Sequence, residues 1–127
     1  MTWKLDDQRS IYRQLIDEIE RRIITGVYAP GSRLGSVRDL ANEAGVNPNT
    51  MQRALTELER TGLVYSMRTS GRFVTDDEEQ IRSRKIMTAR EAVEHFMRQM
   101  YELGLEKEEV LALIRDNQPE AQGQGGK

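Results

Sequence analysis

The sequence predicts a mainly α-helical fold: a winged helix-turn-helix of three helices and a β-hairpin wing, followed by a two-helix appendage. Two helices joined by a glycine-containing turn of about three residues form the signature of a helix-turn-helix. A pattern of two short strands follows directly, as a wing does. Beyond it the composition becomes acidic and a long helical pattern begins. These observations divide the chain into a winged helix over residues 1–75, a helical region over 76–116 and a disordered tail over 117–127.

The first helix is predicted from a buried stripe. Apolar side chains recur at every fourth position: Ile11, Leu15, Ile19 and Ile23. This spacing places them on one face of an amphipathic helix. Ser10 can cap its start, and Gly26 can end it.

The second and third helices have sharp predicted boundaries. Ser36 is a favoured N-cap, and Gly45 ends the second helix. Asn47 caps the third helix, and Pro48 takes its first position, where a missing N–H leaves no bond unmade. Gly62 stops this helix. We therefore expect the two helices to be joined by a turn at residues 45–47.

A β-hairpin is predicted directly after the third helix. Residues 63–67 and 72–75 are short runs rich in Val, Tyr and Phe. Thr69, Ser70 and Gly71 supply the turn between them. A hairpin at this point in the chain is typical of a wing.

Composition and charge limit the function classes. The chain has no cysteine, which excludes disulfides and thiolate chemistry. No apolar run approaches the ~18 residues of a membrane span, and no signal peptide is evident, so we expect a cytoplasmic protein without a membrane partner. The net charge is −2, yet residues 1–75 carry 11 Lys and Arg against 9 Asp and Glu, whereas residues 76–127 carry 8 against 12. A mildly basic first part permits DNA binding without proving it.

The third helix carries the pattern that indicates a function. Its apolar face consists of Met51, Ala54, Leu55 and Leu58. Its nearly opposite face is polar and consists of Asn49, Gln52, Arg53 and Thr56. In a major groove, Asn and Gln pair with adenine edges, Arg pairs with guanine edges, and a Thr methyl group meets thymine. The alternative is a merely solvated face, which the preceding capped helix and the following hairpin disfavour.

Two further segments are candidates for contacts with DNA. Arg38 lies in the first turn of the second helix, near free amides that suit a phosphate; a surface ion pair with Asp39 or Glu43 is the alternative. The hairpin tip over residues 68–72 combines positive charge with small polar groups, which suits a phosphate or the minor groove. An ordinary turn is the alternative there.

No catalytic or metal site is predicted. His95 is the single histidine, and one His without a supporting His or Cys set is weak evidence for a metal. A surface or interface histidine is the preferred interpretation. The sequence has neither a phosphate-binding glycine loop nor a nucleophile with a basic partner at recognisable spacing, so we expect no enzyme and no cofactor.

Ordered motifs between residues 12 and 75 resemble the GntR family of bacterial regulators. The matching stretches lie at residues 12–15, 26–31, 34–41, 45–50, 54–59, 62–63 and 71–74. Examples are Gly45-Val46-Asn47-Pro48-Asn49-Thr50 and Gly71-Arg72-Phe73-Val74. Only about 50 residues follow the wing. This length resembles the short YtrA-type subfamily and not the members with a large effector domain.

The resemblance implies a two-helix dimerisation appendage and repression of an operon, often one that encodes an ABC-type transporter. It also implies DNA contacts at the matching positions: Ser36, Arg38, Asn47, Asn49, Thr50, Gln52, Arg53 and Gly71. With Pro48 and the wing-tip residues Thr69 and Ser70, these are the candidate DNA-binding residues. One departure is Gly35, where the family usually has proline.

Two helices are predicted after the wing, separated by the break at residues 103–105. They carry more large apolar side chains than two short helices bury against each other, and monomers usually avoid exposing such a patch. The candidate dimer contacts are Phe96, Met97, Met100, Leu111 and Ile114. Any small-molecule effector is expected in these helices or at their junction with the winged helix.

The sequence therefore predicts a regulator of transcription that binds double-stranded DNA, foremost a repressor that binds an inverted-repeat operator as a homodimer. An activator with the same DNA-binding mode is one alternative. A winged-helix protein–protein adaptor is the alternative from another class; the acidic pI favours it slightly, and the polar face of the third helix disfavours it.

Overall fold

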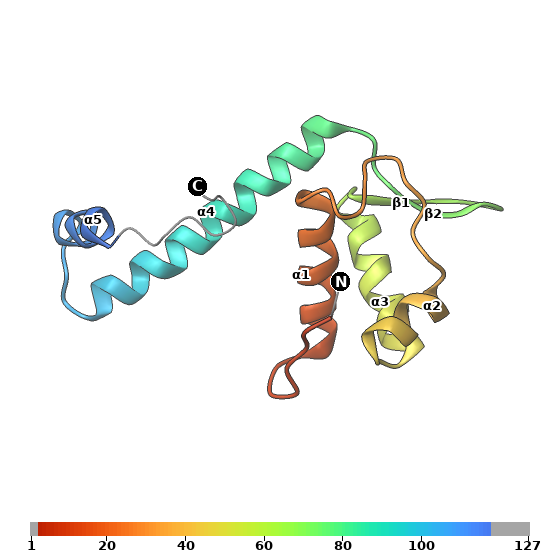
Figure 1. Ribbon diagram of the computed structural model, residues 1–127, viewed down its shortest axis with the longest axis horizontal. Helices are drawn as coiled ribbons and strands as arrows, with labels where there is room; N and C mark the ends of the chain where they lie inside the picture. The colour runs from red at the N-terminus through yellow and green to blue at the C-terminus, as the bar shows by residue number, and fades with distance from the viewer. Residues whose placement is uncertain (1–2, 118–127) are drawn as a thin grey trace. The chain divides into compact units, whose positions relative to one another are not determined.

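The computed structural model describes residues 3–117, and within them the chain forms five helices and one two-stranded sheet (Figure 1). The helices are α1 (Ile11–Ile24), α2 (Val37–Ala44), α3 (Pro48–Arg60), α4 (Glu78–Glu102) and α5 (Lys107–Asp116). The strands are β1 (Val64–Met67) and β2 (Gly71–Val74). The predicted fold class is confirmed. Of the predicted disordered tail, residues 118–127 lie outside the described residues.

The helix-turn-helix begins and ends at the predicted capping residues. The Ser36 hydroxyl oxygen accepts the N–H of Asp39 at 3.0 Å, which satisfies one free amide at the start of α2. Gly45 ends α2 with a φ of 73°, a left-handed conformation that glycine adopts without a steric penalty. Asn47 then caps α3, because its side-chain oxygen accepts the N–H of Asn49 at 2.7 Å. The turn between the helices is therefore held at both ends.

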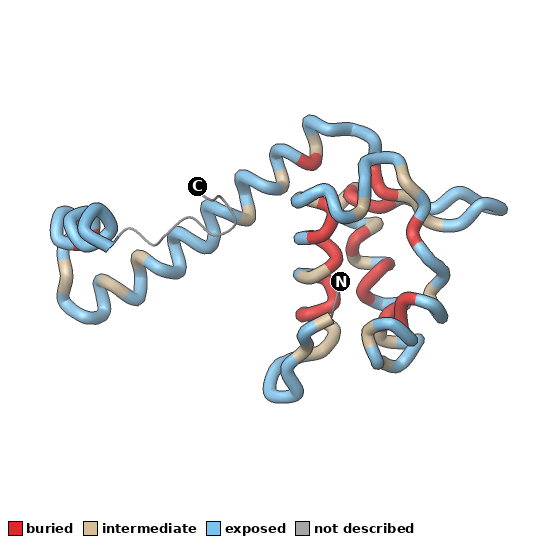
Figure 2. The backbone as a smooth tube through the Cα atoms, in the orientation of Figure 1, coloured by how far each residue is buried: buried red, intermediate tan, exposed pale blue. Residues whose placement is uncertain are grey.

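The core of the winged helix lies where α1, α2 and α3 face one another and meet the base of the hairpin (Figure 2). The largest fully buried side chains there are Leu15, Ile19, Ile23, Met51, Leu55, Leu58, Leu63, Val64 and Val74. Truncating one of these leucines to alanine would cost about 2–5 kcal/mol of unfolding free energy. The core therefore fixes α3 firmly in place.

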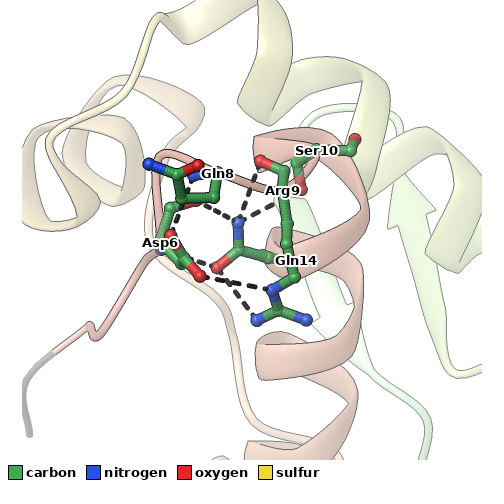
Figure 3. A network of polar contacts seen from close by, with 5 residues as sticks. All are labelled: Asp6, Gln8, Arg9, Ser10 and Gln14. Carbon is green, nitrogen blue, oxygen red and sulfur yellow. Dashed lines mark hydrogen bonds and ion pairs between the residues drawn. The ribbon is translucent and has the colours of Figure 1, made fainter.

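The N-terminal segment folds back onto the start of α1 through one buried side chain, Gln14 (Figure 3). The Gln14 side-chain oxygen accepts the N–H of Asp6 at 2.8 Å, and its amide nitrogen donates to the carbonyl oxygens of Asp6 at 2.7 Å and Arg9 at 3.2 Å. A buried amide with both ends satisfied specifies one path for the chain. This segment is therefore part of the winged helix.

Arg22 is a buried cation nearer the end of α1. Its guanidinium carbon lies 4.0 Å from the centre of the Trp3 ring and 5.7 Å from that of Tyr28. Its Nε also donates to the Glu18 carboxylate at 2.9 Å. A buried charge is tolerated when it is paired in this way. Arg22 thereby ties the N-terminal segment and the loop after α1 to the same helix.

The wing is an antiparallel hairpin with a third segment along its outer edge. Val64 pairs with Val74, and Met67 pairs with Gly71. The sequence predicts Gly71 in the turn. In the structure Gly71 is the first residue of β2, because its backbone still pairs with Met67. Outside the hairpin, Arg33 forms a bridge with Phe73. The loop before α2 therefore widens the wing.

Two compact units divide the chain, Met1–Ile86 and Met87–Lys127. The first turns of α4 belong to the first unit, because Ile81 joins its core and Arg84 forms an ion pair with Glu20 of α1. Within the second unit, the Glu109 carboxylate accepts the N–H of Glu106 at 2.8 Å at the start of α5. None of the described helices, including the long α4, has the length and apolarity needed to cross a membrane.

Candidate nucleic-acid interface

The polar face of α3 is exposed, and the opposite face is fully buried. The buried face consists of Met51, Ala54, Leu55 and Leu58, each with 0% exposed surface. The exposed face consists of Asn49, Gln52, Arg53 and Thr56. The core thus holds one side of α3, while the other side offers hydrogen-bond donors and acceptors. This is the arrangement that a helix in a major groove requires.

Much of the hydrogen-bonding capacity of this face is unused within the protein. The Thr56 hydroxyl donates to the carbonyl oxygen of Gln52 at 3.0 Å, and the Gln52 amide makes only a long bond of 3.4 Å to that hydroxyl. Among the described residues, nothing binds the side-chain amide of Asn49. Both amides can therefore pair with a base edge.

Arg53 differs from its neighbours because an aromatic ring holds it. Its guanidinium carbon lies 4.3 Å from the centre of the Tyr12 ring, a cation–π contact. Tyr12 is half-buried in the first turn of α1. A stacked guanidinium keeps its N–H groups pointing outward in its own plane, where they remain able to donate. Tyr12 could not be identified from the sequence, because only tertiary packing brings α1 beside α3.

Ser36 and Asn47 already use their side-chain oxygens as helix caps, although both residues are exposed. They fix the starts of α2 and α3, where free backbone amides face outward. Pro48 is exposed and Thr50 is half-buried in the first turn of α3. These four residues shape the surface around the polar face of α3.

Arg38 is exposed in the first turn of α2. Within residues 3–117 it makes no ion pair with Asp39 or Glu43, the partners considered from the sequence. Its charge is therefore available next to the N-terminus of α2, whose dipole also attracts anions. This position suits a phosphate.

The wing tip is exposed as a whole. Arg68, Thr69 and Ser70 form the turn, and Gly71 begins β2. Arg72, which the sequence placed among the positive charges of the tip, instead points to α3 and forms an ion pair with Glu59. Its charge is neutralised within the protein.

Glu59 fastens the wing to α3. Its carboxylate accepts hydrogen bonds from the Ser66 hydroxyl at 2.7 Å and from the Arg72 guanidinium. Partial burial alone would raise the pKa of Glu59, but these two hydrogen bonds and the charge of Arg72 outweigh it and lower that pKa. No sequence pattern points to this residue, because it lies 13 residues from Arg72 in the chain.

The second unit exposes a series of large apolar side chains. Of the five candidate dimer contacts, Phe96, Leu111 and Ile114 are exposed, and Met97 and Met100 are half-buried. Further exposed apolar residues of this unit are Met87, Val93, Tyr101, Leu103 and Leu113. An apolar surface of this kind is typical of an interface.

No group of three or more His, Cys, Asp or Glu within the described part of the chain is placed to hold a metal ion. The charged and polar features described above are those of a surface that binds a partner. Their arrangement on a winged helix-turn-helix defines a class, the DNA-binding regulators of transcription.

Comparison with known proteins gives the family. Residues 11–74 match the family model described as "Bacterial regulatory proteins, gntR family". The chain is 40% identical over 112 residues to the HTH-type transcriptional regulator YhcF of Bacillus subtilis, covering 88% of this chain and 93% of that protein. It is 28% identical to the HTH-type transcriptional repressor YtrA of the same organism, covering 89% of this chain and 88% of that protein.

A solved structure agrees with this assignment over nearly the whole chain. A GntR family transcriptional regulator from Listeria monocytogenes superposes with a TM-score of 0.84 at 38% identity, covering 90% of this chain and 100% of that chain. The chain belongs to the GntR family and is a YtrA-type member of it. It is a DNA-binding regulator of transcription, and this class is not enzymatic.

Proposed function

We propose that this chain is a repressor that binds an inverted-repeat operator as a symmetric homodimer. The observation that carries the proposal is the exposed polar face of α3, held by a fully buried apolar face on a winged helix whose wing tip is also exposed. A regulator of this kind acts on the chromosome, which places it in the bacterial cytoplasm.

The contacts with DNA divide into two kinds in this proposal. Asn49, Gln52 and Arg53 reach base edges in the major groove and supply sequence preference. Arg38 and the wing tip contact the sugar–phosphate backbone and supply orientation and affinity. Ser36 and Asn47 orient the backbone amides at the two helix starts, which are donors that a phosphate accepts.

The dimer is supported by the apolar surface of the second unit. Phe96, Leu111 and Ile114 are exposed there, and a two-fold contact would cover the same patch on both copies. A two-fold dimer presents two recognition helices to half-sites related by the same symmetry. Once one recognition helix is bound, the other is held at a high effective concentration near its own half-site, so avidity rises by roughly 10²–10⁴-fold.

Repression is supported by the relatives. YtrA is named a transcriptional repressor, and arabinose metabolism transcriptional repressors from two further organisms also match the chain. Occlusion of a promoter by a bound dimer needs no additional domain. An activator would share the same surface, whereas an adaptor that never contacts DNA is disfavoured by membership in a DNA-binding family.

Selection of bound sequences from a random duplex pool tests the proposal. We expect the full chain to enrich an inverted repeat, whose two halves report the symmetry of the dimer. Transcription in vitro from a promoter that contains this repeat should then decrease when the protein is added. Enrichment of a single half-site would contradict the dimer. Increased transcription would contradict the assignment as a repressor.

A further inference from the structure

Arg33 lies against the wing although it belongs to the loop before α2. Two backbone hydrogen bonds fix this loop to β2: the Leu34 N–H donates to the carbonyl oxygen of Arg72 at 2.9 Å, and the Val74 N–H donates to that of Ser32 at 2.8 Å. They flank the bridge between Arg33 and Phe73. Directly paired residues project their side chains to the same face of a sheet. Arg33 therefore shares the face of Phe73 and of Gly71, two residues earlier.

Gly71 leaves the space that the Arg33 side chain occupies. A Cβ atom at Gly71 would lie 3.1 Å from Nε and 3.3 Å from Nη2 of Arg33, closer than ordinary van der Waals contact. Gly71 pairs with Met67 in the last pair of the hairpin before the turn. The Arg33 guanidinium thus lies beside the turn at residues 68–70.

The two arginines next to this turn differ in what they contact. Arg72 faces α3 and is neutralised by Glu59. Arg33 is exposed, and no residue in the described range 3–117 forms an ion pair or hydrogen bond with its side chain. Because neighbouring positions on a strand face opposite ways, Arg33 and Arg72 lie on opposite faces of the wing. Arg33 therefore keeps an available charge beside Gly71, in addition to that of Arg68 in the turn.

We propose that Arg33 binds a DNA phosphate beside the wing tip, so that a residue from the loop before α2 completes the wing's contact with DNA. A guanidinium matches phosphate oxygens with paired hydrogen bonds. Because Gly71 has no side chain, the Arg33 guanidinium lies close to the backbone beside the wing tip before DNA arrives. The inference rests on the proposed operator binding and adds to it a specific interaction with the DNA backbone.

Salt-dependent binding tests this interaction in the full chain. The two probes are a random-sequence duplex and the duplex that the parent chain enriches from such a pool, each followed by fluorescence anisotropy between about 50 and 200 mM NaCl. The variants are Arg33→Ala, Arg33→Gln and Arg33→Lys. Arg82→Ala is the matched control, because Arg82 is an exposed arginine that belongs to α4 and not to the hairpin or the loop before α2, and its removal changes the net charge equally.

Arg33→Ala and Arg33→Gln should lower the affinity for both probes by the same factor. The slope of log K against log salt is negative, and each variant should make it less steep by about 0.9 for every phosphate that the protein no longer neutralises. For a dimer with two wings the change should be about twice as large. Arg33→Lys should retain most of the slope, and Arg82→Ala should retain all of it. Circular dichroism should show unchanged folding, since the side chain is exposed.

Two results would overturn the inference. The first is a slope for Arg33→Ala equal to that for Arg82→Ala. The second is weaker binding of the enriched duplex alone, which would indicate that Arg33 meets a base. Failure of the parent chain to enrich any duplex would instead contradict the proposed operator binding, and the random-sequence duplex would still report on Arg33.

Discussion

Arg53 of α3 lies over the ring of Tyr12 of α1, with 4.3 Å between the guanidinium carbon and the ring centre. The contact joins an exposed residue of the candidate recognition face to a half-buried residue of the neighbouring helix. A guanidinium held on a ring loses less freedom when it binds a base than a freely moving one does. Tyr12 is therefore expected to act as a positioning residue for Arg53.

A double-mutant cycle measures this coupling. Arg53→Ala should cost about 1–3 kcal/mol of operator binding and relax the preference at one base position. Tyr12→Ala should reduce that preference by about 0.5–1 kcal/mol, whereas Tyr12→Phe, which keeps the ring, should reduce it little. In the Arg53→Ala background, Tyr12→Ala should not reduce the preference further. Fully additive effects would show that Tyr12 does not act through Arg53.

Substitutions of Gln52 and of Arg38 should weaken DNA binding in different ways. Gln52→Ala removes an amide from the recognition face, so it should lower the affinity for the enriched duplex and leave the affinity for a random-sequence duplex nearly unchanged. Arg38→Ala removes a charge near the start of α2, so it should lower the affinity for both duplexes and make the slope of log K against log salt less steep. Parallel titrations of the two variants on the two duplexes distinguish these outcomes. Equal effects of Gln52→Ala on both duplexes would refute its role in base recognition.

Glu59 should make the stability of the wing depend on pH. Its folded-state pKa is lowered from the ordinary value of 4.5, so its stabilisation is present above about pH 4.5 and is lost as the pH falls through the lowered value. Glu59→Gln should therefore lower the thermal midpoint at pH 7 and reduce its decline between about pH 5 and pH 3. Glu43→Gln, an exposed change on α2, serves as the control.

Hydrogen exchange locates the same effect. The β1 and β2 amides should exchange faster in Glu59→Gln at pH 7, while those in the middle of α1 should not, because the hydrogen bonds of this carboxylate to the described residues outside its own helix are those to Ser66 and Arg72 of the wing. A parallel pH dependence of the parent chain and Glu59→Gln would argue against the role of this carboxylate.

The dimer should depend on the apolar surface of the second unit. Met97→Glu with Met100→Glu should give a monomer in sedimentation and reduce operator affinity by roughly 10²–10⁴-fold, because a charge at a covered position opposes association. Leu111→Glu changes a side chain that is already exposed within the protomer, and it should also dissociate the dimer without unfolding the unit.

The control adds two charges at exposed polar positions of α4, Ser83→Glu with Gln99→Glu. This variant should sediment like the parent chain. A parent chain that sediments as a monomer at micromolar concentration would contradict the dimer model.

Local signals in the sequence predicted the helix-turn-helix closely. Ser36, Gly45 and Asn47 act on amides and carbonyls within a few residues of themselves, so their type and spacing define the helix ends directly. The division of α3 into an apolar and a polar face follows from helical periodicity in the same way.

The contacts that refine the candidate site could not be predicted in this way. Arg33 meets Gly71 and Tyr12 meets Arg53 across segments far apart in the chain, and neither pair has a characteristic spacing. The sequence predicts a free charge for Arg72 at the wing tip, and this prediction is wrong, because its partner Glu59 is identified only when α3 and the hairpin are in place. Electrostatic roles depend on such pairings more than on residue type.

The separation of the two faces of α3 has a consequence for how such regulators diversify. The residues that fold the helix, Met51, Leu55 and Leu58, are fully buried, whereas Asn49 and Gln52 project outward. Substitutions at these outward positions change which operator is recognised at little cost in stability, because surface changes away from caps and core usually alter it by less than about 0.5 kcal/mol. A duplicated gene could therefore acquire a new set of target promoters through a few codon changes in α3, while its product continued to fold as before.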